Sequence, residues 1–378
     1  MKASGILTAL LALTLLEASS AYAVPIVITY QNDPGVGFYD PVLGASRRAC
    51  IEAAAANWAN RLKGTVPVQV TASMVSMGGT ATSAILGGAY AKWIFSDLPG
   101  KTPGVFYVVA EANQIVGYDL VTPANVPAGS TPDDINITYN SDVDNSTVLG
   151  NLSFYYGTDG RPGSNFDFYH TCFHELGHGL GFTSGFSQTT IGTYAYGLPL
   201  IYDTFLATGP AANAPLLTSL TDAQRAAAIT SNALYFEGPN ARAAAANTNP
   251  QIYAPATYQK GSSTAHLNEA SYSGTTLHAS INELMTPYLG PGVMHYPGPI
   301  VSGIFEDIGW SFQPYTMTEA KTALKDYAGM LTASEANVVR VHRYGLSTYP
   351  GRISLQDAVG VIRAAAGTET NPYILGTP

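Results

Sequence analysis

The stretch from His174 to Phe182, which reads HELGHGLGF, constrains this chain more than any other. Its first five residues have the pattern H-E-x-x-H. Residues four apart in a helix lie on the same face, so the imidazoles of His174 and His178 can reach one zinc ion. Glu175 follows the first histidine directly, and its carboxylate can take a proton from a water molecule at that metal. The stretch therefore predicts a helix that carries a zinc site.

Two further residues could extend this site. His170 precedes His174 by four positions, but eight helical residues rise about 12 Å, whereas zinc–nitrogen bonds are about 2.0–2.1 Å. One ion therefore cannot bind both His170 and His178, and we expect His170 to be structural or merely near the site. Asp203 lies on a predicted helix after the motif, and it is an alternative third ligand because carboxylates also bind zinc.

Residues 1–23 have the pattern of a secretory signal peptide. Lys2 supplies a positive charge, residues 6–16 form an apolar core, and Ala21-Tyr22-Ala23 forms an A-x-A cleavage site. The apolar run is too short for a membrane-spanning helix, and no later stretch approaches the ~20 apolar residues that a crossing needs. We expect an exported protein, periplasmic or extracellular, with no membrane span. We also expect no inhibitory pro-segment, because the first predicted strand follows the cleavage site closely.

The charge of the chain limits its partners. Only 11% of residues are charged and the formal net charge is -9, which argues against binding to nucleic acid or to an anionic membrane. Glycine and tyrosine are abundant, with 38 and 24 copies, so much of the surface should be uncharged and polar.

The chain has two cysteines, Cys50 and Cys172. In an exported protein they predict a single disulfide, which would join a helix expected at 45–62 to the motif helix; two free thiols are the alternative. Cys172 lies two residues before His174, about 200° round the helix, so it should point away from the metal and into the fold.

Hydrophobic patterning predicts an α+β protein. Strands are expected at 24–30, 66–70, 85–95, 135–139 and 152–156, and helices at 45–62, 166–181, 199–206, 222–229 and 299–309. The segment 105–116 is ambiguous between helix and strand. Residues 24–312 should form one domain in two lobes, with the sheet and the motif helix in 24–181 and an insertion and second lobe in 182–312.

Residues 313–378 differ in composition and predict a small all-α module with helices at 318–330, 335–344 and 354–366. The stretch 351–358, GRISLQDA, weakly resembles the loop-to-helix joint of a dockerin-type repeat. The positions where a calcium loop needs carboxylates hold Leu346, Thr348 and Pro350, so we expect no calcium in that loop.

The motif H-E-x-x-H-x-x-G, completed here by Gly181, resembles the metzincin clan of zinc metallopeptidases. The run from Asn282 to Pro287, NELMTP, resembles the Met-turn of the leishmanolysin-like branch, whose members carry a long insertion before the third histidine. The resemblance covers about 166–310. It implies a two-lobed metzincin-like fold with a twisted sheet and the active-site helix in the N-terminal lobe.

The resemblance also implies the rest of the site. Compact members have their third histidine where this chain has Ser184, and a serine hydroxyl is a poor zinc ligand. The third ligand would instead be His266, shortly before the Met-turn. Met285 would form a hydrophobic floor under the metal, and Tyr288 or Tyr296 could donate a hydrogen bond to a developing oxyanion.

The implied activity is that of a secreted endopeptidase with Zn²⁺ as cofactor. His174, His178 and His266 would leave the fourth metal position open for water, and Glu175 would act as general base. The partner would be a protein or peptide substrate, and we expect a monomer.

Two alternatives belong to other functional classes. An inactive secreted protein with a structural zinc would close its site with four protein ligands and would not need Glu175. A surface-attachment protein would carry its function in the C-terminal helices.

Overall fold

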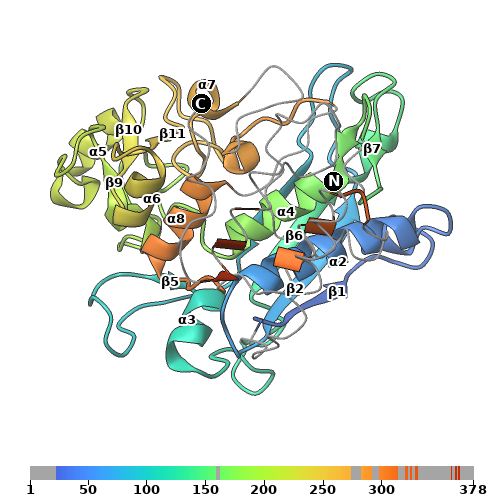
Figure 1. Ribbon diagram of the computed structural model, residues 1–378, viewed down its shortest axis with the longest axis horizontal. Coiled ribbons are helices and arrows are strands. Elements are labelled where there is room, and N and C mark those ends of the chain that lie inside the picture. The colour runs from blue at the N-terminus through green and yellow to red at the C-terminus, as the bar shows by residue number, and fades with distance from the viewer. Residues whose placement is uncertain are drawn as a thin grey trace, which may run out of the picture.

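The computed structural model describes residues 23–158, 162–273, 282–291 and 298–313, together with scattered positions between 320 and 366. It is an α+β protein, as the sequence predicts (Figure 1). The described strands are β1 (Ile26–Tyr30), β2 (Val68–Val75), β3 (Gly87–Ala91), β4 (Ile94–Phe95), β5 (Tyr107–Val108), β6 (Ile135–Asn140), β7 (Phe154–Tyr155), β8 (Phe166–Asp167), β9 (Leu206–Ala207), β10 (Leu234–Phe236) and β11 (Gln251–Ile252). The described α-helices are α2 (Gly44–Arg61), α3 (Val109–Val116), α4 (Phe168–Gly179), α5 (Asp222–Ala228), α6 (Pro239–Ala244), α7 (Glu269–Tyr272) and α8 (Pro299–Ile308).

The N-terminal half is built on a four-stranded sheet with the order β1-β2-β6-β3. The first three strands are parallel, and β3 runs antiparallel to β6 at one edge, with Ala89 opposite Ile137. Alternate side chains of a strand point to opposite faces. The even-numbered residues of β2, from Val68 to Met74, are all buried, so one face of the sheet lies against the core.

Helices α2 and α4 cover that buried face and pack side by side (Figure 1). Trp58 of α2 stacks on Phe173 of α4 with ring centroids 4.6 Å apart, and its indole N–H donates a hydrogen bond to the Phe173 carbonyl oxygen at 2.9 Å. Burying one side chain such as Phe173 contributes roughly 1.5–3 kcal/mol. This packing fixes the motif helix against the sheet.

The second half lies on the other side of α4 and contains the antiparallel sheet β11-β10-β9 with α5 and α6 (Figure 1). Helix α8 crosses α6 closely: a Cβ on Gly303 would lie 2.7 Å from the Ala241 nitrogen, so a side chain has no room there. The Asp307 carboxylate accepts hydrogen bonds from the backbone N–H groups of Asn240 and Ala241. These contacts tie the insertion to the segment that returns to the N-terminal half.

Several predicted elements are confirmed, including β1, α2, β6 and α8. Helix α5 opens with a capping box formed by Thr221 and Gln224. Three segments differ. The expected strand at 85–95 is divided into β3 and β4, the ambiguous segment 105–116 contains both β5 and α3, and 199–206 forms only a 3-10 helix over Tyr202–Phe205. The division at 92–93 arises because β4 leaves β6 and pairs with β5.

The predicted disulfide is wrong, because Cys50 and Cys172 are free thiols in the structure. Both are fully buried on the packed helices α2 and α4. The Cys50 thiol donates to the Tyr156 carbonyl oxygen at 3.1 Å, and burial raises its pKa to about 12. Burial also raises the pKa of Cys172 well above its ordinary value. A disulfide forms through a thiolate, and this core disfavours the thiolate.

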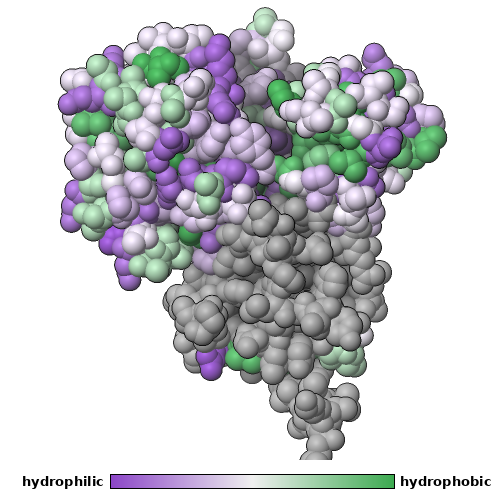
Figure 2. Space-filling view, turned by 90° about the horizontal axis from the view of Figure 1, so that it is seen from above, coloured by the Kyte–Doolittle hydropathy of each residue, from purple (hydrophilic) through white to green (hydrophobic). Residues whose placement is uncertain are grey.

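Figure 2, which views the molecule from above, shows hydrophobic residues gathered on the right-hand part of the described surface. Most of the exposed large hydrophobic side chains lie between Val27 and Tyr90, in the N-terminal half. No helix among the described residues is both long and apolar enough to cross a membrane.

Some predictions fall outside the described residues. They are the signal peptide up to residue 22, Tyr296, and nearly all of the C-terminal module, including the loop with Leu346, Thr348 and Pro350.

Candidate metal centre

Helix α4 sets the positions of the first two histidines. The Asp167 side chain caps its first turn by accepting a hydrogen bond from the His170 backbone N–H at 3.1 Å. The helix ends at Gly179, and Gly181 turns the chain with φ +123, a value that favours glycine. Between these ends, His174 and His178 lie one turn apart on the same face, as their spacing requires.

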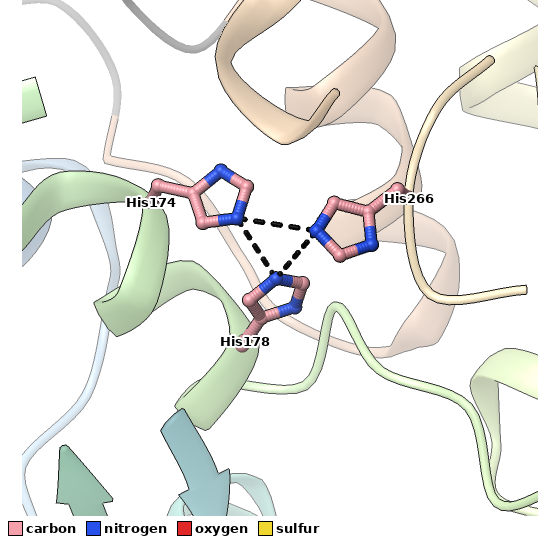
Figure 3. Close-up of side chains that lie close together, drawn as sticks. All are labelled: His174, His178 and His266. Atoms are coloured by element: carbon pink, nitrogen blue, oxygen red, sulfur yellow. Dashed lines mark hydrogen bonds between the residues drawn. The ribbon is translucent and has the colours of Figure 1, made fainter. Parts of the chain in front are cut away.

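His266 meets these two histidines from a distant part of the chain (Figure 3). The Nε2 atom of His178 lies 3.0 Å from that of His174 and 3.1 Å from that of His266, and the remaining pair is 3.3 Å apart. Tetrahedral zinc with bonds of about 2.0–2.1 Å would hold its nitrogens about 3.3 Å apart. The structure thus brings together the three predicted histidines at a spacing that suits one metal ion.

The outward-facing nitrogen of each imidazole fixes its tautomer. Each Nδ1 lies within hydrogen-bond distance of a backbone carbonyl oxygen: Leu284 for His174 (2.6 Å), Phe182 for His178 (2.7 Å) and Ser262 for His266 (2.9 Å). A carbonyl oxygen can only accept, so each Nδ1 carries the proton and each Nε2 presents a lone pair. Three lone pairs that converge within 3.3 Å repel one another unless a cation lies between them. The donor set therefore fits a divalent metal.

The electrostatics of the histidines agree with this role. Burial lowers the pKa of His178 to about 4. The pKa of His266 is also lowered well below its ordinary value, first by burial and then by the neighbouring His178 and His174. Neutral imidazole is the form that binds metals. His178 and His266 are therefore in the binding form at neutral pH.

Glu175 lies on the same helix but does not belong to the histidine group. It is 6% exposed, and its Oε1 atom faces Gly87 of β3. Burial raises its pKa to about 8. A nearby cation would oppose this shift by favouring the charged carboxylate. Glu175 is thus a buried carboxyl that follows His174 in the sequence and is not a member of the histidine group.

The return of His266 depends on two backbone contacts. The Tyr253 N–H donates to the His266 carbonyl oxygen at 2.8 Å, and the Leu267 N–H donates to the Met285 carbonyl oxygen at 2.8 Å. The first contact joins His266 to the residue after β11, and the second joins its neighbour Leu267 to the predicted Met-turn. The segment 182–265 therefore loops out and returns, as the resemblance implies.

Met285 packs under the motif helix. It is fully buried, and its Sδ lies 3.0 Å from the place that a Cβ on Gly177 would occupy. Gly177 lies between the two helical histidines in the sequence. The absence of its side chain lets Met285 approach the helix, and its role as a floor under the metal stays a prediction.

Asp203 does not join the histidines, and it holds the chain after the motif instead. The Ser184 hydroxyl donates to its Oδ1 at 2.7 Å, and the backbone N–H groups of Gly185 and Leu200 both donate to its Oδ2 at 2.9 Å. Burial raises the pKa of Asp203 to about 6, although these hydrogen bonds oppose the shift. Asp203, the alternative third ligand, therefore accepts hydrogen bonds away from the histidines, and Ser184 is one of its donors.

The remaining candidates lie outside the histidine group. His170 is buried, with its ring centroid 6.2 Å from that of His174. The Tyr288 hydroxyl contacts the Tyr253 hydroxyl at 3.1 Å and donates to Gln259 at 2.9 Å. The three carbonyl partners of the imidazoles could not be predicted from the sequence, because backbone groups leave no signal in side-chain identity.

No protein-family model matches this chain, and neither a curated protein nor a solved structure matches it. Its chemistry has to be inferred from the residues of the site.

Proposed function

We propose that this protein is a secreted zinc-dependent endopeptidase of the metzincin type, in its leishmanolysin-like branch. The observation that carries the proposal is the convergence of three imidazole nitrogens, with a buried glutamate directly after the first of these histidines in the sequence. His174, His178 and His266 would hold the metal and leave a fourth position open. When bound, zinc lowers the pKa of a water molecule towards 7 and polarises a substrate carbonyl.

Glu175 supplies the proton transfer. Its carboxylate takes the proton of the attacking water and delivers it to the nitrogen of the leaving amine. Burial raises the pKa of this carboxyl and so makes it a stronger base. A base works best when its pKa lies near the working pH, and this environment moves Glu175 in that direction.

A structural zinc site is the competing function, and two observations favour the enzyme. The histidine group has three members among the described residues, whereas structural zinc sites close with four. Burying the Glu175 carboxyl also has a free-energy cost, and a purely structural site, in which it is no candidate ligand, gains nothing in return.

The decisive experiment compares wild type, Glu175→Ala and a control in hydrolysis of unfolded casein, with and without a chelator. Wild type should bind about one zinc per chain and lose activity with the chelator. Glu175→Ala should keep the zinc and lose activity by about 10²–10⁴-fold, the usual contribution of a general base. Glu306→Ala, which changes an exposed glutamate on α8, should behave as wild type.

Two results would contradict this proposal. Undiminished proteolysis by Glu175→Ala would remove the proton-transfer role. A wild-type protein that binds zinc tightly but cleaves no peptide would favour the structural zinc site.

A further inference from the structure

Gly87 lies on the edge strand β3, next to the carboxylate of Glu175. A Cβ added to Gly87 would lie 3.3 Å from Glu175 Oε1. The same Cβ would lie 3.1 Å from the Tyr139 Cδ1 atom and 3.2 Å from the Thr138 carbonyl oxygen. All three distances are shorter than ordinary van der Waals contacts, so a side chain at this position would force a neighbour to move.

The neighbours differ in how easily they can move. Thr138 belongs to β6, which is paired on one side with β2 and on the other with β3. Tyr139 is fully buried, and its ring packs against Phe168 with centroids 4.9 Å apart. Glu175 has rotatable side-chain bonds, whereas strand pairing holds Thr138 and aromatic packing holds Tyr139. The Glu175 carboxylate is therefore the group that would yield.

We propose that Gly87 is a positioning residue for Glu175. Its missing side chain leaves the space that the Glu175 carboxylate occupies next to β3. The backbone of Gly87 and the ring of Tyr139 form steric walls that limit where this carboxylate can lie. The inference rests on the proposed function, in which Glu175 transfers the proton.

The same strand supplies a matched control. Gly88 follows Gly87 on β3, its side-chain direction is opposite, and a Cβ there would meet no atom within 4 Å. Gly87→Ala and Gly88→Ala thus make the same chemical change on the two faces of one strand. Only the first adds a methyl group against Glu175.

The test measures peptide hydrolysis by the two variants together with zinc affinity. Gly87→Ala should lower kcat by about 10–100-fold, because small misplacement of a catalytic group has effects of that size. Its KM should stay within about threefold of wild type, since substrate binding does not use this carboxylate. Gly88→Ala should stay within about twofold of wild type in both constants. Both variants should keep wild-type zinc affinity.

Thermal unfolding gives a second readout that needs no activity. Gly87→Ala should lower the Tm of the wild-type protein. The same substitution should lower the Tm less in a Glu175→Ala background, because the added methyl group then meets one neighbour fewer. Equal kcat values for the two glycine variants, or an equal Tm shift in both backgrounds, would overturn the inference. Absence of wild-type proteolysis would instead defeat the proposed function, and the Tm comparison would still test whether the two residues contact each other.

Discussion

The histidine cluster draws on two regions whose side chains are positioned in different ways. His174 and His178 come from one helix, where a four-residue spacing places them on one face. That helix packs against α2 through Trp58 on Phe173 and against the sheet through Tyr139 on Phe168. His266 comes from an irregular segment held by backbone hydrogen bonds to Tyr253 and, through Leu267, to Met285.

The second region relies on buried polar groups more than on long elements. Its strands have two or three residues. The carboxylates of Asp203 and Asp307 accept hydrogen bonds from backbone N–H groups that are not paired within a β-sheet. The difference teaches that two members of the site follow from local geometry, whereas the third requires the second half to fold correctly. Variants in the two regions should therefore separate loss of metal from loss of structure.

The largest effect is expected for His266→Ala. Zinc affinity should fall by more than about 100-fold, beyond the 10–100-fold that removing an outer-shell partner causes. The affinity can be measured by competition with a chromophoric chelator. His170→Ala, which removes a histidine outside the cluster, should change the affinity less than about tenfold. Wild-type zinc affinity in His266→Ala would mean that the second region contributes nothing to the site.

A smaller effect is expected for Asp203→Asn. The amide cannot accept hydrogen bonds at both of its polar atoms, so Ser184 or the N–H groups of Gly185 and Leu200 would lose their acceptor. The free energy of unfolding should fall by about 1–3 kcal/mol. Zinc affinity of the folded protein should change less than about tenfold, since Asp203 lies outside the cluster.

Denaturant unfolding measures this loss, and Asp222→Asn is the control. Asp222 is an exposed carboxylate that forms an ion pair with the largely buried Arg225 on α5, and an ion pair of a solvent-exposed carboxylate contributes about 0–1 kcal/mol. If Asp203→Asn lost zinc as severely as His266→Ala, Asp203 would have to be a ligand, and the assignment of the third position would change.

The smallest and most gradual effect is the pH dependence caused by Asp203. The pKa of Asp203 is raised to about 6 in the folded protein from its ordinary value of 3.8. The folded state therefore binds this proton more tightly than the unfolded state does. Stability from this group is therefore largest below pH 4 and declines as pH rises to about 6, by at most about 1.4 kcal/mol per pH unit. The difference in unfolding free energy between wild type and Asp203→Asn should shrink over this range. A difference that grows with pH would contradict the assignment.

Much of the fold could be predicted from local patterns. The helix over 45–62 and the strand over 135–139 occur within one or two residues of their expected bounds, because their apolar periodicity and terminal glycine or polar residues act locally. The segment 85–95 was predicted less well. Its division into β3 and β4 depends on partner strands from elsewhere in the chain.

The cysteines show a second limit of sequence reasoning. Composition and export predict a disulfide, but the pairing of two thiols depends on their local environment. In the structure, Cys50 donates a hydrogen bond to Tyr156, and both thiols are buried in an apolar core. Neither fact is encoded in the spacing of the two residues.

The sequence by itself determined the helix of the site, the adjacency of His174 and His178, and the position of Glu175 between them, because helical geometry acts over a few residues. Only the tertiary structure decided that His266 completes the cluster while Asp203 binds Ser184. The three carbonyl groups that orient the imidazoles were also decided there. Contacts between residues far apart in the chain follow from how the second half packs against the first, and no local pattern records that packing.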